Sequence, residues 1–470
     1  MFLLTMRKLT IAYGLLLLIT SPLLAQTSLP TQAQHQPVLL ISLDGLRPDY
    51  VTQADAHQLK IPNLRRILAE GTHAEGVIGV YPTVTYPSHT TLITGVAPAE
   101  HGVLNNTRFD PERKFAGAWL WYAEQVKVPT LWAAAHAAGL HTASVSWPVT
   151  VNAAGIDDLI PEYWRGASPG DSSNPDDRLL MNAISRPDDE LARMAARIGV
   201  EYMIGNDTTL ASDEIRTLYS LDILKNHRPE FMTIHLSSLD EEEHLHGPFT
   251  AEVNEDLEGL DGMVGRLTTQ ELANYPNAVV VIVSDHGFTK VEHATNLYIP
   301  FIEAGLIQLG KSASGAVQVK SWKAQPWLAG GMAAVILHDA NDTETRDQVK
   351  ALLDKLAADP TSGVETVYDH NAITKLGGFP DAAFIVTLKD DYYTGSGIAG
   401  ALVGPPMVKG MHGFDPQKLP AMRSSFFATG QGIAHGKDLG VVDMRQIAPT
   451  LAAILGVSLP DAKLAALPVR

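Results

Sequence analysis

The 470-residue chain contains no cysteine, which excludes disulfides, thiolate metal ligands, a lipid-modified cysteine and a cysteine nucleophile. It has no internal repeat and only one long apolar run, at its N-terminus. Basic residues are scarce, since 35 lysines and arginines face 52 aspartates and glutamates, for a formal charge of −17. A chain this acidic is not expected to bind a nucleic-acid polymer over a broad basic face. A single phosphate can still bind at a local cationic or metal-lined site.

The apolar run extends from Ile11 to Ala25 and follows Arg7 and Lys8. A charged start, a short apolar stretch and a small residue at the end predict a signal peptide over residues 1–25, with export to the periplasm or the exterior. An uncleaved anchor is the alternative, but the run is shorter than the roughly 20 apolar residues that a span needs. Residues 26–36 form a polar linker, and no membrane insertion is expected after cleavage.

Apolar runs rich in β-branched residues alternate with amphipathic stretches along the rest of the chain. The runs predict buried strands at residues 37–43, 141–147, 230–236 and 277–283, and the stretches predict helices at 61–70, 130–138 and 253–267. This alternation indicates an α/β domain over residues 37–470 with a mostly parallel sheet. Residues 295–410 have glycine- and proline-rich turns and short strands at 333–337 and 382–388, which predict a smaller inserted α+β segment. The chain closes with a strand at 424–429 and a helix at 443–455.

Thr85 lies between Pro82 and Pro87, just before a predicted helix whose first turns include residues 90–95. The start of a helix offers unpaired backbone N–H groups, which suit an anion such as phosphate. A hydroxyl at this point is a candidate nucleophile, provided that something removes or stabilises its proton. No histidine–carboxylate pair lies near Thr85 in the sequence.

Carboxylates and imidazoles recur at loops and strand ends, where parallel sheets collect functional groups. The candidates are Asp44 after the first strand, Asp240 and His244 four residues apart, the pair Asp285–His286, and His412 in a glycine-flanked loop. Mixed Asp/His sets suit zinc and related divalent ions. Each piece alone has a structural interpretation, because acid runs form solvated loops and an Asp-His pair after a strand caps turns. Together with Thr85 they predict a two-metal site, in which a metal would lower the pKa of the threonine hydroxyl.

These residues, with the segments Thr83–His89, His101–Asn106, His246–Pro248 and Ser284–Gly287, closely resemble the nucleotide pyrophosphatase/phosphodiesterase family of the alkaline phosphatase superfamily. The resemblance implies an alkaline-phosphatase-like fold and an exported hydrolase that releases a nucleoside monophosphate from nucleotide phosphodiester or pyrophosphate bonds. It implies a small-molecule substrate and two zinc ions.

The resemblance also implies a role for each residue. Asp240, His244 and His412 would hold one zinc, and Asp44, Asp285, His286 and the Thr85 oxygen the other. Thr85 would attack phosphorus to form a covalent intermediate that water then hydrolyses. Asn106 and the backbone N–H of Tyr86 or Thr85 would steady a phosphate oxygen. Tyr86 and Tyr163 would hold the nucleobase, with Trp164 competing for the second role.

Three residues depart from the family pattern: Ser88, where asparagine is common, His246, where an aromatic is common, and Arg108, where an apolar residue is usual. Arg108, with Arg165, supports an alternative, a threonine-nucleophile phosphomonoesterase or phosphonate hydrolase of the same superfamily. A non-catalytic binding protein on this fold is a third hypothesis, which a lost ligand would favour, and no expected ligand is missing.

Overall fold

The computed structural model describes residues 35–112, 114, 119–164, 177–202, 207–311 and 315–470. The predicted signal peptide and residues 26–34 of the predicted linker lie outside the described residues. Among the helices that the structure describes, none is both long and apolar enough to cross a membrane.

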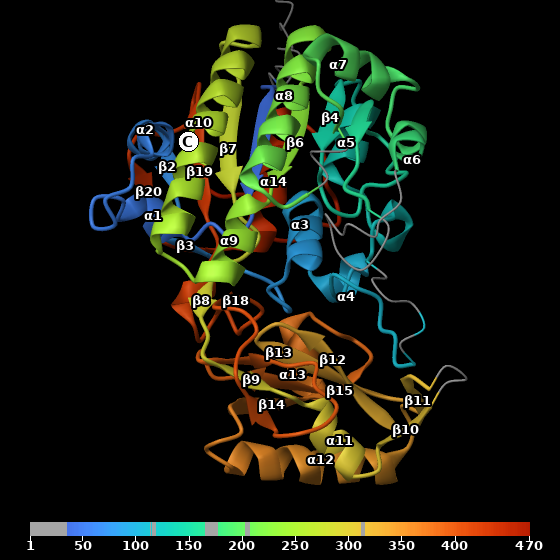
Figure 1. The fold of residues 1–470 in the computed structure, drawn as a ribbon. Coiled ribbons are helices and arrows are strands. Elements are labelled where there is room, and N and C mark those ends of the chain that lie inside the picture. The colour runs from blue at the N-terminus through green and yellow to red at the C-terminus, as the bar shows by residue number, and fades with distance from the viewer. Residues whose placement is uncertain (1–34, 113, 115–118, 165–176, 203–206, 312–314) are drawn as a thin grey trace, which may run out of the picture. The chain divides into compact units, whose positions relative to one another are not determined.

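An eight-stranded sheet with the order β20-β2-β19-β7-β1-β6-β4-β5 forms the centre of the described chain (Figure 1). Five of its neighbouring pairs are parallel, and only β19 runs antiparallel to both of its neighbours. The α/β class with a mostly parallel sheet is therefore confirmed. Its strands are β1 (Val38–Leu43), β2 (Thr72–His73), β4 (Thr142–Val145), β5 (Asp158–Ile160), β6 (Phe231–Leu236), β7 (Val279–Val283), β19 (Phe426–Gly430) and β20 (Lys437–Asp438).

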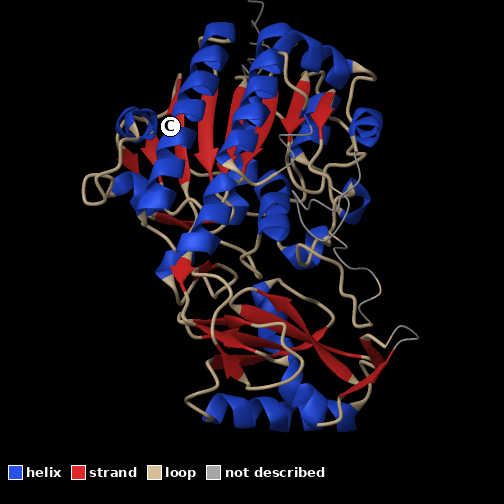
Figure 2. Ribbon diagram, in the orientation of Figure 1, coloured by secondary structure: helices blue, strands red, loops and turns tan. Residues whose placement is uncertain are grey.

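Helices cover both faces of this sheet because its central strands are apolar on both sides (Figure 2). In β1, Leu39 and Ile41 face one hydrophobic core, and Val38 and Leu40 face the other. The helices of the first core are α2 (Pro62–Glu70), α7 (Glu190–Ile198), α8 (Leu210–Asn226) and α10 (Ala251–Asn274). Those of the second core are α3 (Thr85–Thr94), α5 (Leu131–Ala137) and α14 (Ile447–Leu455).

The register of the three central strands brings their carboxyl ends to one edge. Leu43 pairs with Leu236 of β6, and Ser42 pairs with Val283 of β7. The next residues along each strand therefore lie close together at this edge. They lead into Asp44, into helix α9 (Ser238–His246) and into Asp285.

A second, antiparallel sheet has the order β12-β13-β15-β14. One face packs on helix α12 (Thr343–Ala358), and the other packs on Tyr81 and Val84, which precede Thr85. A backbone bond from Gly331 N–H to the carbonyl of His412, at 2.8 Å, joins this sheet to the His412 loop. The strands of this second sheet are β12 (Ala324–Ala329), β13 (Met332–Leu337), β14 (Val364–Asp369) and β15 (Ala382–Leu388).

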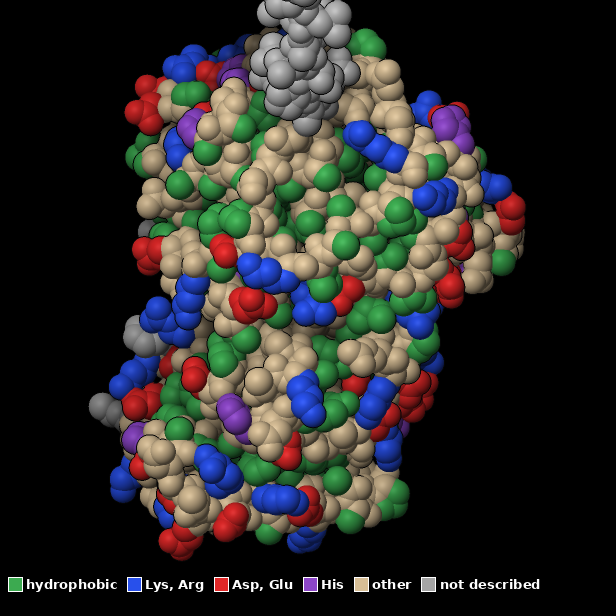
Figure 3. All heavy atoms as spheres, turned by 180° about the vertical axis from the view of Figure 1, so that it is seen from behind, with side chains coloured by type: hydrophobic (Ala, Val, Ile, Leu, Met, Phe, Trp, Pro, Cys, Tyr) green, Lys and Arg blue, Asp and Glu red, His purple; other side chains and the backbone are tan. Residues whose placement is uncertain are grey.

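The remaining elements are short and connect these layers. The helices are α1 (Pro48–Thr52), α4 (Pro98–His101), α6 (Arg178–Ile184), α11 (Tyr298–Glu303) and α13 (His370–Leu376). The strands are β3 (Gly76–Ile78), β8 (Thr289–Lys290), β9 (His293–Thr295), β10 (Ile307–Lys311), β11 (Val317–Trp322), β16 (Tyr392–Thr394), β17 (Val403–Gly404), β18 (Gly410–Met411) and β21 (Val441–Asp443). On the face shown in Figure 3, basic side chains are mixed with acidic ones and form no continuous basic surface.

Two predicted elements differ in their extent. The predicted helix 443–455 is a strand end, a short 3₁₀ turn and then α14, because the Asp443 side chain and Gln446 form a capping box ahead of the helix. The predicted helix 253–267 extends to Asn274 as α10, with Leu267 and Glu271 buried on the same face.

Candidate active site

Thr85 is the first residue of α3 and follows Val84, whose backbone is extended. The helix thus begins at Thr85 itself, not after it. Across residues 79–98, Thr85 alone is not buried. His89, one turn later, places Nδ1 2.9 Å from the Thr85 carbonyl and Nε2 2.9 Å from the Ser42 hydroxyl. Burial lowers the pKa of His89 to about 3, so this neutral ring joins the first turn of the helix to Ser42 of β1.

Asn106 lies against this first turn. The Tyr86 N–H donates to Asn106 Oδ1 at 2.9 Å, and the Asn106 N–H donates to the Asn105 side chain at 2.8 Å. Because a backbone N–H can only donate, the amide atom that faces it must be the oxygen. The Asn106 NH₂ group is therefore the free end. The Tyr86 N–H, one of two predicted phosphate donors, is already used by Asn106, which leaves the Thr85 N–H as the backbone candidate.

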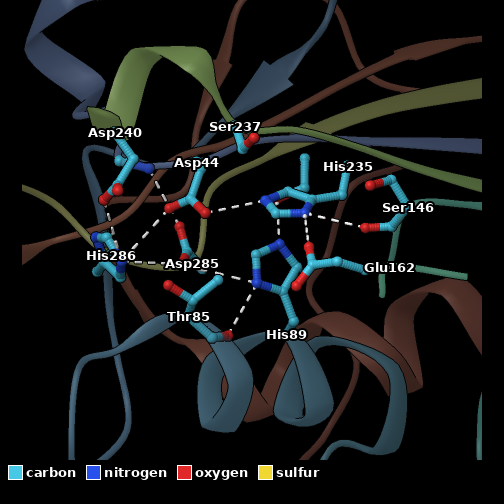
Figure 4. A network of polar contacts seen from close by, with 12 residues as sticks. Asp44, Thr85, His89, Ser146, Glu162, His235, Ser237, Asp240, Asp285 and His286 are labelled. Carbon is cyan, nitrogen blue, oxygen red and sulfur yellow. Dashed lines mark hydrogen bonds and ion pairs between the residues drawn. The ribbon is translucent and has the colours of Figure 1, made fainter. Parts of the chain in front are cut away.

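Two groups of side chains beside Thr85 are arranged so that each could hold a metal ion (Figure 4). One comprises Asp240, His286 and His412, and the other comprises Asp44, Asp285 and His286. In each group the ligand atoms all lie within 4.8 Å of one another. His286 belongs to both.

The distances between the ligand atoms show which residues lie closest within each group. His286 Nε2 is 3.0 Å from Asp285 Oδ2 and 3.4 Å from Asp44 Oδ1, but 3.9 Å from Asp240 Oδ1. Asp240 instead has His244 Nε2 at 3.5 Å and His412 Nε2 at 3.7 Å. His286 thus lies closer to the Asp44 group, and His244 is the additional neighbour of Asp240.

Buried polar atoms without a hydrogen-bond partner converge on this point. They are Asp44 Oδ1, Asp240 Oδ1, Asp285 Oδ2 and His286 Nε2. Such atoms are costly to leave unpaired in a protein interior. Each one belongs to the two groups just described, so the residues present fit a metal ion.

The three histidines are oriented alike. Each places Nδ1 near a backbone carbonyl: His244 at 3.0 Å from Gly410, His412 at 3.1 Å from Thr83 and His286 at 3.3 Å from Gly287. A carbonyl accepts only, so Nδ1 carries a proton, and in the neutral ring Nε2 has a free lone pair. This is the arrangement that outer hydrogen bonds give to metal-ligating histidines.

The electrostatics of the site also favour a cation. Burial raises the pKa of Asp44, and the neighbouring carboxylates of Asp285 and Asp240 raise it further. Burial lowers the pKa of His412, which keeps the ring in the neutral form that metals bind. Three carboxylates gathered in the interior repel one another, and a divalent cation between them would remove that repulsion.

Helix α9 explains how Asp240 and His244 come together. The acid run Asp240–Glu243 is helical, not a solvated loop, so residues four apart lie on one face. Glu243 is fully buried and accepts a hydrogen bond from Tyr50 at 2.8 Å, which anchors the helix. His246 Nε2 lies 3.4 Å from Glu242, and His246 belongs to neither of the two groups described above.

Tyr86 and Tyr163 are both buried, with exposed fractions of 1% and 8%. The Tyr86 ring packs against Trp119, and its hydroxyl donates to Glu162. The Tyr163 ring packs on Trp121. Neither ring presents an open face to solvent, and nucleobase stacking on them stays a prediction.

A buried chain of polar side chains behind Asp44, shown in Figure 4, was not predicted from the sequence. His235 Nε2 lies 2.9 Å from Asp44 Oδ2, and His235 Nδ1 lies 3.2 Å from Glu162. Burial lowers the pKa of His235, but its hydrogen bonds to Asp44 and Glu162 outweigh this and raise the pKa to about 10. The available signal was a polar His235 inside an otherwise apolar strand.

The chain is similar in sequence and in fold to known proteins. The sequence model for type I phosphodiesterase / nucleotide pyrophosphatase matches residues 38–415. Human ectonucleotide pyrophosphatase/phosphodiesterase family member 1 is 26% identical over 285 residues, which is 57% of this chain and 25% of the relative. A venom phosphodiesterase of Crotalus durissus collilineatus is 26% identical over 278 residues, 56% of this chain and 28% of the relative. The chain thus spans about a quarter of the length of these curated relatives.

A solved structure shares the fold. An inactive variant of murine ectonucleotide pyrophosphatase/phosphodiesterase 5, in complex with AMP, superposes with a TM-score of 0.62 at 18% identity. The match covers 92% of this chain and 97% of that one. At this identity the likeness shows the common architecture.

Proposed function

Because the chain belongs to the type I phosphodiesterase / nucleotide pyrophosphatase family, we propose that it is an exported two-zinc hydrolase of nucleotide phosphodiester and pyrophosphate bonds. It acts on small-molecule nucleotides through a covalent Thr85 intermediate and releases a nucleoside monophosphate. Residues 37–470 form its catalytic domain, with about 295–410 as an insert. The observation that carries the proposal is the convergence of unpartnered, buried ligand atoms beside Thr85, a half-buried residue at a helix start.

In this proposal Asp240, His244 and His412 hold one zinc, and Asp44, Asp285, His286 and the Thr85 oxygen hold the other. The distances support this division, since Asp240 is the most distant carboxylate from His286. Zinc at these positions supplies positive charge, which lowers the pKa of the hydroxyl and offsets the charge of the phosphate.

The protein's own groups then carry out two displacements. Thr85 Oγ forms a bond to phosphorus as the bond to the leaving oxygen breaks. The free NH₂ of Asn106 donates to a non-bridging phosphate oxygen, and the Thr85 N–H at the helix start adds a second donor. Water then attacks the same phosphorus, the bond to Thr85 breaks, and the hydroxyl is regenerated.

The charges around the site favour a diester over a dianionic monoester. Among the described residues, no lysine or arginine forms an ion pair with Asp44, Asp240 or Asp285. Arg108 is exposed, and Arg165 lies outside the described residues. Within the part of the chain that the structure describes, a second negative charge on the substrate would therefore find no lysine or arginine already held at these carboxylates.

We expect the zinc-loaded protein to prefer an aryl phosphodiester to the matching monoester by about 10²-fold or more in kcat/KM. The second negative charge of the monoester would lack a cationic partner, and such a loss is worth several kcal/mol. The measurement is paired initial rates, with zinc content determined on the same sample. A preference for the monoester would establish the phosphomonoesterase instead. No activity on either ester or on a dinucleoside polyphosphate, with no bound metal, would indicate a non-catalytic protein.

Replacing Asn106 with alanine should lower kcat by about 10²- to 10³-fold, the usual cost of one oxyanion donor. Zinc content should be unchanged, because Asn106 is in neither metal-ligand group. Asn105→Ala tests the loop itself, because the Asn105 side chain donates to the Leu328 carbonyl and accepts the Asn106 N–H, but does not contact Tyr86. Equal losses of kcat in the two variants would show that Asn106 acts only by shaping the loop.

A further inference from the structure

Four buried side chains form one continuous hydrogen-bonded chain between the Asp44 group and the nucleophile helix. Asp44 follows β1, His235 lies in β6, Glu162 follows β5, and Tyr86 is the second residue of α3. His235 contacts Asp44 on one side and Glu162 on the other, and the other oxygen of Glu162 accepts from the Tyr86 hydroxyl. The exposed fractions are 3% for Asp44, 1% for His235, 7% for Glu162 and 1% for Tyr86, so these four side chains are shielded from solvent.

His235 lies where a single ring reaches both carboxylates. Met232, Ile234 and Leu236 of β6 face the first hydrophobic core, so His235 points to the opposite side of the sheet. There its Nδ1 also lies 3.1 Å from the Ser146 carbonyl of the neighbouring strand end. Both ring nitrogens thus have fixed partners, and the ring cannot turn without losing one of them.

The two oxygens of Asp44 consequently have different surroundings. Oδ2 is held by His235 at 2.9 Å, whereas Oδ1 has no hydrogen-bond partner and lies in the group with Asp285 and His286. A free carboxylate rotates easily about its terminal torsion. The contact with His235 removes this freedom and directs Oδ1 toward the position proposed for the metal.

We propose that His235 and Glu162 are a positioning pair that orients the Asp44 carboxylate for metal binding and holds Tyr86, the neighbour of Thr85, through the same chain. The inference rests on the proposed function, because it assigns the pair to the zinc group that includes Thr85. Outer hydrogen bonds of this kind are typically worth about 10- to 100-fold in metal affinity or activity. Neither residue touches the reacting atoms in this scheme.

Two substitutions of His235 form a matched pair. In His235→Gln the side-chain NH₂ reaches the place of Nε2 and keeps a donor for Asp44. In His235→Asn the NH₂ reaches only the place of Nδ1, so Asp44 loses its partner while the Glu162 contact is kept. We expect the zinc affinity of the Asp44 group to fall about 10- to 100-fold in His235→Asn and by less than about threefold in His235→Gln.

The readout is zinc competition against a chromogenic chelator on the full-length protein, with kcat, KM and the thermal midpoint without metal measured alongside. A purely structural role would lower the midpoint of both variants and affect zinc affinity equally, and that result overturns the proposal. If His235→Asn does not fold, Glu162→Gln replaces it. That variant has to weaken zinc binding about threefold or more for the proposal to stand.

The outcome is separable from the proposed function. Wild-type protein that binds two zinc ions and hydrolyses diesters, together with a His235→Asn variant of unchanged zinc affinity, would reject the positioning pair alone. Wild-type protein that binds no zinc would reject both.

Discussion

Thr85→Ala is expected to abolish turnover of phosphodiesters, with a fall in kcat of about 10⁴-fold or more, as for other catalytic nucleophiles that act as a unit with their activators. Thr85 is the one residue of 79–98 that is not buried, and it lies beside Asp285 and His286 (Figure 4). Zinc content should stay near two per chain, because three side chains of the Asp44 group are left in place. Steady-state rates and metal analysis on the same preparation test this expectation.

Thr94→Ala is the matched control. Thr94 lies in the same helix, is buried, and donates its hydroxyl to the Thr90 carbonyl at 2.7 Å. Its loss should leave kcat within about threefold, because a hydroxyl-to-backbone bond of this kind contributes only about 1 kcal/mol to stability. Near wild-type turnover in Thr85→Ala would reject Thr85 as the nucleophile.

His286→Ala is expected to have a comparable effect on activity, roughly 10⁴-fold, and a larger effect on metal content. Its Nε2 lies within 3.9 Å of Asp44, Asp240 and Asp285, so it is the residue that the two ligand groups share. We expect zinc to fall from two per chain to about one, the ion held by Asp240, His244 and His412, whereas His244→Ala should keep the zinc of the Asp44 group.

His246→Ala serves as the control for these histidine variants. His246 lies on α9 only two residues from His244, but its Nε2 lies 3.4 Å from Glu242, whereas Nε2 of His244 lies 3.5 Å from Asp240. It should retain both zinc ions and full activity. Loss of zinc in His246→Ala, or two retained zinc ions in His286→Ala, would contradict the assignment.

The central sheet could be predicted well because buried parallel strands have a strong local signature. The run is continuously apolar in β7 and mostly apolar in β1 and β6, and polar residues follow each of them. Asp44 and Asp285 are therefore expected at one edge of the sheet from their place in the sequence, since parallel strands align their carboxyl ends. The same reasoning did not reveal that Asp240 and His244 lie on a helix, because Glu243 is buried against Tyr50 by a contact distant in sequence.

Contacts between distant segments account for what the sequence did not show. His412 reaches the site because the second sheet holds its loop through Gly331, and no local pattern encodes that bond. His235 is a polar residue in a mostly apolar strand, but its role depends on the contact with Glu162, which is 73 residues away in the sequence. The Tyr86 N–H is a plausible phosphate donor by sequence, but Asn106 occupies it in the folded chain.

The central claim is that Thr85 forms a covalent bond to the substrate phosphorus. Rapid acid quenching of the zinc-loaded protein during turnover of an aryl phosphodiester, followed by peptide mass spectrometry, tests it directly. We expect the phosphoester adduct on the peptide that contains Thr85, and none in Thr85→Ala. An adduct on another residue, or turnover with no adduct at any quench time and no burst of the released phenol, would contradict the account.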